Sequence, residues 1–305
     1  MSGDFKYMVC TRCMTYNHKP FIEEALRGFA MQQITFPVVT VVVDDASTDG
    51  EQDLLRQWAA VNLDLQADAA YERDNERVHV ISAPLKDNAL HTFVMVLLKV
   101  NLYKKKEKRA YYAEWYDNAK YVAHCEGDDY WTHPRKLQMQ VEILEAHPEY
   151  SLCFHNAQTY SISQGTFIEK FHLPATSRKF TARPLFTTGW FVPSASILQR
   201  QMPLPEFMTE YWRNECSQTG SDIMTLLYYS SKGDFWYIGE TMSVYRFGIP
   251  GSVTDRNKKA GKSQAHAHYL KLLRYTNIKL FHGKYSFFVL YRYISYYLHR
   301  VLRGH

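Results

Sequence analysis

The sequence has little cysteine and no long apolar run. Five cysteines in 305 residues are an odd number, and most lie inside apolar segments, which is typical of reduced thiols in the cytosol. Cys10 and Cys13 form a lone C-x-x-C pair, so a zinc or redox site is not expected. No window reaches about 18 uncharged apolar residues, and the first residues do not resemble a secretion signal. We therefore expect a cytoplasmic protein.

Glycine-rich phosphate loops are also missing. Neither G-x-G-x-x-G nor a Walker A motif occurs, which argues against a nucleotidyltransferase, and no nucleic-acid partner is expected. Acidic residues are absent from residues 256–305, which carry eleven Lys and Arg. Because the net charge of the whole chain is +5, the first 255 residues carry −6. This asymmetry predicts a separate partner for the C-terminal segment.

The remaining composition, 46% hydrophobic and 22% charged, is that of a globular protein with a full core. Apolar runs alternate with segments of helical periodicity, and the run at 38–43 is β-branched without alternation, as in a strand buried on both faces. The pattern predicts an α/β fold with a doubly wound, mostly parallel sheet. Strands are expected at 7–15, 36–44, 78–83, 121–126, 150–161, 190–199 and 235–248, and helices at 20–33, 51–60, 134–147 and 221–233.

Polar or acidic side chains follow three of the expected strands. Tyr16 and Asn17 follow the first, Asp44 and Asp45 end the second, and the segment 126–129 follows the strand "YVAHC". In open parallel sheets, ligands bind beyond the carboxyl ends of the strands. One crevice is therefore expected to collect these residues.

Three acids, Glu126, Asp128 and Asp129, stand at the end of a buried strand. Such a cluster costs desolvation and repulsion unless a cation or donors compensate it. Carboxylates at this spacing suit Mg²⁺ or Mn²⁺, so Asp128 and Asp129 are the predicted metal ligands. The alternative is that the aspartates form a turn before a helix capped by Thr132, just as the residues at 47–49 suit a turn and cap.

Four segments together resemble a bacterial family 2 glycosyltransferase with the GT-A fold. They are "MTYNHKPFIEEAL", "VVVDDASTDG", "EGDDYWTHPRKLQMQVEILEAHPEYSLCFHN" and "TGSDIMTLLYYSSKGDFWYIGETMSVYR". The resemblance covers most of residues 8–250 and implies a GT-A domain at 1–255 followed by a helical extension at 256–305. It also implies an inverting transferase that uses a nucleotide-diphosphate sugar and Mg²⁺ or Mn²⁺.

The resemblance implies roles for the residues at the first two strand ends. Tyr16 lies against the nucleotide base, Asn17 is in the adjoining turn, and Asp45 of the Asp44–Asp45 pair accepts a hydrogen bond from the base. Because a carboxylate accepts from the ring N–H of uracil, thymine or guanine but not of neutral cytosine, a UDP-sugar is favoured and dTDP- and GDP-sugars remain open.

Further roles follow from the later motifs. Glu126 and Asp128 correspond to the acids that hold the ribose and the metal-bridged diphosphate, with glutamate where the family usually has aspartate. Asp222 corresponds to the catalytic base; the alternative is a first-turn aspartate behind a Ser221 cap. Arg246 would reach the diphosphate or else form a surface ion pair. Trp131 would line the acceptor site or else belong to the core.

The predicted reaction transfers a sugar from this donor to a hydroxyl of a glycan or lipid-linked acceptor, in cell-surface polysaccharide synthesis. A non-catalytic sugar-nucleotide-binding or glycan-binding protein and a nucleotidyltransferase are the alternatives. The donor sugar, linkage and oligomeric state stay open.

The C-terminal segment 284–304 has helical spacing. An apolar side is predicted opposite a basic stripe of Arg292, His299 and Arg303. This pattern fits an interfacial helix on an anionic membrane surface. The alternative is an apolar side packed on the catalytic domain. The residues of the apolar side are Phe287, Leu290, Ile294, Leu298 and Val301.

Overall fold

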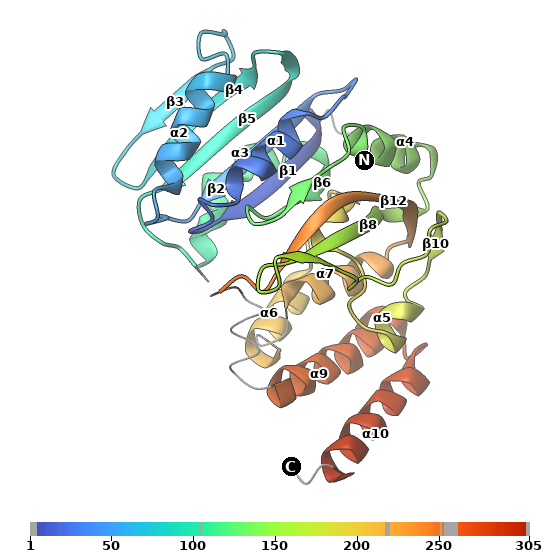
Figure 1. The fold of residues 1–305 in the computed structure, drawn as a ribbon. Helices are drawn as coiled ribbons and strands as arrows, with labels where there is room; N and C mark the ends of the chain where they lie inside the picture. The colour runs from blue at the N-terminus through green and yellow to red at the C-terminus, as the bar shows by residue number, and fades with distance from the viewer. Residues whose placement is uncertain (1–4, 104, 217–219, 251, 253–261, 303–305) are drawn as a thin grey trace.

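The structure is a computed structural model that describes residues 5–103, 105–216, 220–250, 252 and 262–302; the side chains at 106, 262–263 and 299–302 lie outside the description. It is a mixed α/β fold whose twelve-stranded sheet has a parallel centre and carries helices on both faces, as the sequence predicted (Figure 1). The strand order is β10-β12-β8-β11-β6-β1-β2-β5-β4-β3, with β7 beside β12 and β9 beside β8.

The strands have the following bounds: β1 Tyr7–Thr15, β2 Val38–Asp44, β3 Tyr71–Asp74, β4 Val78–Leu85, β5 Asn88–Leu98, β6 Ala119–His124, β7 Tyr130–Trp131, β8 Tyr150–Ser161, β9 Thr166–Ile168, β10 Arg178–Phe180, β11 Leu198–Arg200 and β12 Asp234–Phe247. The α-helices are α1 Ile22–Ala30, α2 Glu51–Asn62, α3 Ala113–Tyr116, α4 Lys136–Ala146, α5 Arg183–Thr187, α6 Glu206–Glu215, α7 Ser221–Ser230, α9 Lys262–Phe281 and α10 Ser286–Leu302. Short 3₁₀ helices occupy Lys106–Tyr111 (η1) and Ser194–Ser196 (η2).

The parallel centre consists of β6, β1, β2 and β5. On one face, α1, α2 and α4 cover a core that includes Val9, Val42 and Leu137; on the other, the α3 region packs Trp115 against β1 and β2. Every residue of β2 is buried, which explains its β-branched sequence without alternation. The strands predicted at 7–15 and 150–161 begin and end at the predicted residues.

Two sequence predictions of strands were wrong. The segment before η1 was not assigned a strand, but β5 runs through its apolar part and returns antiparallel along β4, so regular βα alternation stops after α2. A hairpin forms because a polar turn at 86–88 separates two apolar runs. Most of the strand predicted at 190–199 is irregular: after Pro193 the chain makes the turn η2, and only Leu198–Arg200 join the sheet.

The C-terminal extension contains two helices. Leu272 and Leu273 of α9 are buried with α7 and the ends of β8 and β12 in a second core, and α10 lies beside α9 at the end of the molecule away from β3 (Figure 1). Within the described residues, neither of these helices nor any other is both long and apolar enough to cross a membrane.

Candidate functional site

The three polar strand ends meet at one edge of the sheet, as predicted. Strand β1 pairs in parallel with β2, so that Thr15 lies opposite Asp44, and with β6 on its other side. The pairing continues past β6, because the backbone N–H of Gly127 donates to the carbonyl of Met14 at 3.0 Å. The residues after β1, β2 and β6 therefore lie at the same end of the sheet, and this group is called here the acidic edge: Tyr16, Asn17, Asp44, Asp45, Glu126, Asp128 and Asp129.

Gly127 is required by the close approach of two strand ends. A Cβ atom at Gly127 would lie 2.3 Å from Oγ1 of Thr15. This distance is too short for any residue with a side chain. The absence of a side chain lets the acid-bearing turn after β6 lie directly against the end of β1. Glycine thus sets the spacing between the first and third strand ends.

The turn after β1 is fixed by hydrogen bonds to the turn after β2. The backbone N–H of Asn17 donates to Oγ of Ser47 at 2.8 Å, and the N–H of Thr48 donates to Oδ1 of Asn17 at 2.8 Å. Asn17 has φ 57°, a left-handed conformation that asparagine tolerates better than most residues. The neighbouring Tyr16 is 44% exposed.

Glu51 connects the turns after β1 and β2 at the acidic edge. Sequence reasoning did not predict this role. Its buried carboxylate accepts hydrogen bonds from the Thr15 hydroxyl, from the His18 N–H at 2.8 Å and from Oγ of Ser47 at 3.0 Å. Burial, and then the charge of Asp44, raises the pKa of Glu51. The sequence marks Glu51 only as a first-turn acid of α2, and that pattern carries no signal of burial.

Asp44 and Asp45 have different surroundings. Oδ1 of Asp44 accepts from the Ser47 N–H at 3.0 Å and from Nε2 of Gln52 at 2.5 Å, whereas its buried Oδ2 has no partner among the described residues. Oδ1 of Asp45 accepts from the N–H of Leu102 at 2.7 Å, and Oδ2 accepts from Nζ of Lys108 at 2.5 Å. The segment between β5 and β6 therefore covers Asp45, and the role of Lys108 was not predicted from sequence.

Two of the acids after β6, Glu126 and Asp129, have raised pKa values. The carboxylate of Asp129 is buried and accepts the backbone N–H of Arg246 at 2.8 Å; desolvation, and then the charge of Asp128, holds the pKa of Asp129 well above its usual range. Desolvation, and then the charges of Asp128 and Asp222, raise the pKa of Glu126 to about 8, although part of this side chain is exposed. Asp128 is partly exposed, 3.8 Å from Nε2 of His18.

Asp222 joins this group from the other half of the sequence. It lies in the first turn of α7, where its Oδ2 accepts from the Ser194 hydroxyl at 2.9 Å, and its charge raises the pKa of Glu126. The capping alternative was wrong in its Ser221 part, because Gly220 is the N-cap and no side chain caps α7. The carboxylate of Asp222 is thus near the acidic edge and exposed.

Arg246 contacts the turn that carries Asp128 and Asp129. Its guanidinium donates to the carbonyl oxygen of Asp128 at 2.7 Å, pairs with Glu24 and lies over the rings of Phe21 and Tyr130 at 4.9 and 4.6 Å. The ion pair of the alternative is present, with the partly exposed Glu24, but Arg246 itself is only 7% exposed and does not lie at the surface. In this arrangement Arg246 fixes the turn that carries the aspartates.

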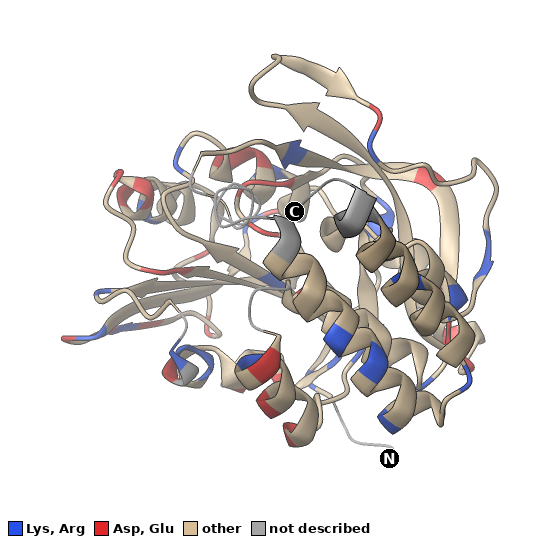
Figure 2. Cartoon of the chain, turned by 90° about the horizontal axis from the view of Figure 1, so that it is seen from below, with Lys and Arg blue, Asp and Glu red and all other residues tan. Residues whose placement is uncertain are grey.

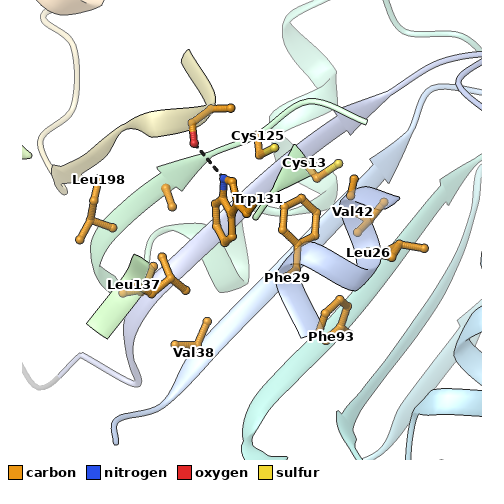
Figure 3. Close-up of a cluster of buried hydrophobic side chains, with 14 of the residues drawn as sticks. Cys13, Leu26, Phe29, Val38, Val42, Phe93, Cys125, Trp131, Leu137 and Leu198 are labelled. Carbon is orange, nitrogen blue, oxygen red and sulfur yellow. Dashed lines mark hydrogen bonds between the residues drawn. The ribbon is translucent and has the colours of Figure 1, made fainter. Parts of the chain in front are cut away.

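Trp131 belongs to the core, so its assignment to an acceptor wall was wrong. Its ring meets Phe29 edge-on at 4.9 Å, and its indole N–H donates to the carbonyl of Ala195 at 2.8 Å (Figure 3). The predicted Thr132 cap was also wrong: Thr132 follows β7, and α4 begins four residues later without a side-chain cap. The aspartates therefore precede a short strand rather than a capped helix.

The acidic edge can be tested for its fit to a divalent cation. In the described part of the chain, no three His, Cys, Asp or Glu side chains are spaced to enclose a metal. Asp128 and Asp129 nevertheless form an under-compensated pair of hard oxygen donors, as the raised pKa of Asp129 indicates. Mg²⁺ and Mn²⁺ are commonly bound by one or two carboxylates plus substrate phosphates. The residues fit a cation shared with a diphosphate, not one enclosed by protein.

A cavity of about 650 Å³ lies away from the acidic edge, near the N-terminal ends of β2 and β5. It is lined by residues such as Gln33, Thr35 and Asn88, and no residue of the acidic edge borders it.

Comparisons with known proteins support a glycosyltransferase-like fold. S. aureus TarS residues 1–349, solved with UDP-GlcNAc and with UDP, superposes with TM-scores of 0.55 and 0.54 at 14% and 12% identity. These alignments cover 88% and 89% of this chain, and 65% and 66% of TarS 1–349. No family model matches the chain. The similarity to these structures shows the fold, which is GT-A-like.

Sequence comparison matches the chain to bacterial proteins. An uncharacterized protein of Mycobacterium tuberculosis is 29% identical over 254 residues; the match covers 80% of this chain and 61% of that protein, so this chain spans about three fifths of its length. A Bacillus subtilis protein named as a candidate teichuronic acid biosynthesis glycosyltransferase, TuaG, is 25% identical over 264 residues, covering 85% and 86% of the two chains.

Proposed function

We propose that this protein is an inverting glycosyltransferase of the family 2 type, which moves a sugar from a nucleotide-diphosphate donor to a hydroxyl group. One observation carries the proposal: Asp222 of α7 lies close enough to the acids after β6 to raise the pKa of Glu126. This supports placing a base candidate and a diphosphate-binding candidate, 96 residues apart in sequence, in one site. The fold similarity to TarS is consistent with this proposal.

The donor site is assigned to Tyr16, Asn17, Asp44 and Asp45. The exposed ring of Tyr16 would stack on the base, while Asn17 and Asp44 hold the two turns that frame it. Asp45 would accept the base N–H, which favours a UDP-sugar. TarS was solved with UDP and with UDP-GlcNAc, which supports a uridine donor in a protein of this fold.

Transfer needs a base for the acceptor hydroxyl and a stabilised leaving group. The Asp222 carboxylate removes the hydroxyl proton, the oxygen attacks the anomeric carbon, and the bond to the diphosphate oxygen breaks with its electrons leaving on UDP. Attack from the face opposite the leaving group inverts the configuration. Ser194 holds Asp222 in place through its hydroxyl group.

Asp128 and Asp129 would hold Mg²⁺ or Mn²⁺, and Glu126 would contact the ribose. When bound, the cation would neutralise charge on the departing diphosphate. Arg246 keeps Asp129 in position through its backbone N–H, and its side chain anchors the Asp128 carbonyl. Its further role toward the diphosphate would require release from Glu24.

The acceptor is proposed to be a glycan or a lipid-linked glycan in cell-surface polysaccharide synthesis, which the name of the TuaG relative supports. Residues 1–255 would form the GT-A domain and residues 256–305 an extension. The protein would act in the cytoplasm, peripherally on the inner face of the plasma membrane.

A donor-hydrolysis assay tests this function. The full chain is incubated with UDP-GlcNAc and other sugar nucleotides, with Mn²⁺ or with EDTA, and free UDP is measured. Metal-dependent release of UDP that disappears in Asp222→Asn supports transfer chemistry. Exchange of pyrophosphate into the sugar nucleotide would instead indicate a nucleotidyltransferase, and binding without turnover would indicate a binding protein.

A further inference from the structure

Helix α10 packs on the protein by only one of its sides. Tyr285, which precedes the helix, and Val289 are buried in the second core, and Phe288 and Tyr293 pack against that core from the same side. Arg292 also faces the protein, where its guanidinium donates to the carbonyl of Thr187 at 3.1 Å. These contacts fix the rotation of the helix about its axis.

The opposite side of α10 is apolar and exposed. Its residues recur at helical spacing and are 49% to 74% exposed, so they form one continuous strip; we call it the α10 strip. The sequence-based alternative, in which this apolar side packs on the catalytic domain, was therefore wrong. The prediction that Arg292 lies opposite the apolar side in a basic stripe was also wrong, because Arg292 lies on the packed side. Val301, His299 and Arg303 fall outside the described side chains. The α10 strip consists of Phe287, Leu290, Tyr291, Ile294, Tyr297 and Leu298.

The surroundings of the α10 strip carry positive charge. No Asp or Glu occurs in residues 256–305, and the two helices show blue but no red in the view from below (Figure 2). Arg274 and Lys279 of α9, and Lys284 in the turn before α10, are exposed. The remainder of the chain is net negative.

We infer that the α10 strip docks on an anionic lipid surface, with α10 lying in the plane of the interface. A strip of Phe, Leu, Ile and Tyr favours the boundary between headgroups and acyl chains, where tyrosine keeps its hydroxyl in water. The exposed basic residues of α9 and of the turn before α10 are attracted by anionic lipid. Pairing of the α10 strips of two copies is disfavoured, because two acid-free, basic extensions would repel each other.

This inference deepens the proposed function, because a lipid-linked acceptor would be met at the same surface. Its physical basis is nevertheless independent of transfer chemistry, since no residue of the acidic edge takes part. Vesicle binding and donor hydrolysis can therefore fail separately, and each result bears on one proposal only.

Co-sedimentation tests the α10 strip. The full chain is mixed with vesicles of phosphatidylglycerol and phosphatidylcholine, or of phosphatidylcholine alone. We expect binding to the anionic vesicles that weakens as salt rises, and at least about a tenfold loss of affinity in Leu290→Ser/Ile294→Ser. The control Val61→Ser/Phe167→Ser removes two apolar side chains that are 68% and 52% exposed elsewhere, and should bind like the parent.

Site-specific labelling gives a second measurement. All five cysteines are buried, so a cysteine placed on the surface can be labelled selectively. An environment-sensitive dye on Ile294→Cys should become brighter and blue-shifted with anionic vesicles, whereas a dye on Val61→Cys should not change. An intact protein that fails to bind anionic vesicles at low salt overturns the inference. So does a dimer in solution that Leu290→Ser/Ile294→Ser converts to monomer.

Discussion

Lys108 donates its ammonium to the carboxylate of Asp45 at 2.5 Å, across 63 residues of sequence. Asp45 is buried at the end of β2, and Lys108 is the single charged partner of its carboxylate among the hydrogen bonds and ion pairs of the described residues. The residue proposed to accept the base N–H is thus already occupied by a cation from the segment before β6. A nucleotide that uses Asp45 must share or displace this ion pair.

Replacing Lys108 tests that competition. Lys108→Met should lower the free energy of unfolding by about 1–3 kcal/mol, because Asp45 keeps a single backbone donor for a buried charge. UDP should recover part of this loss by supplying a new donor, so its stabilising shift in Tm should be larger in the variant than in the parent. Lys105→Met, which removes the same charge from an exposed position of the same run, is the control and should behave like the parent.

Substitution of Asp222 separates catalysis from binding. Asp222→Asn should reduce kcat about 10²-fold or more while leaving UDP affinity nearly unchanged, because a general base acts in the transition state. Ser194→Ala, which frees Oδ2 of Asp222 from its hydroxyl partner, should give a smaller loss of kcat. Steady-state kinetics and calorimetry measure the two quantities. Near-normal turnover of Asp222→Asn would contradict the assignment.

The order of the motifs made the acidic edge predictable. Parallel pairing brings the ends of neighbouring strands together, so acids after β2 and β6 had to meet the turn after β1 once the sheet was parallel. The partners of those acids could not be predicted in the same way. Glu51, Lys108 and Ser194 reach them through burial and loop paths, which have no periodic signature in sequence.

The rotation of α10 about its axis could not be predicted from sequence either. Helical spacing identified its apolar side, but the pattern cannot say whether that side faces protein or solvent. The outcome depends on Tyr285 and Val289, which are buried in the second core where α10 contacts α5 and α9, so that the strip faces outward. Tertiary packing decided what the hydrophobic pattern left open.

Asp129 should couple donor binding to the cation. Its buried carboxylate is under-compensated, and Asp129→Asn removes the charge while an amide oxygen can still accept the Arg246 N–H. The variant should therefore keep or slightly raise its Tm but lose the Mn²⁺-dependent part of UDP affinity, measured by calorimetry with Mn²⁺ and with EDTA. Unchanged UDP affinity in Mn²⁺ would remove Asp129 from the cation site.

Glu126 should make the stability of the free protein fall as pH rises. Its pKa is raised from 4.5 to about 8, so the folded chain holds a proton that the unfolded chain releases at lower pH. Between those two values the folded state binds more protons than the unfolded state, and the free energy of unfolding must decrease with increasing pH. Glutamine resembles the protonated acid, so Glu126→Gln should match the parent near pH 5 and exceed its Tm near pH 8.

Thermal unfolding of both proteins across this range, without metal or nucleotide, measures the effect. Glu210→Gln, at an exposed position on α6, serves as the control and should show no pH-dependent difference from the parent. If the Tm difference between Glu126→Gln and the parent stays constant from pH 5 to pH 8, Glu126 does not titrate in that window. The repulsion of Glu126 by Asp128 and Asp222 would then be weak, and the proposed convergence of α7 with the acids after β6 would lose its electrostatic support.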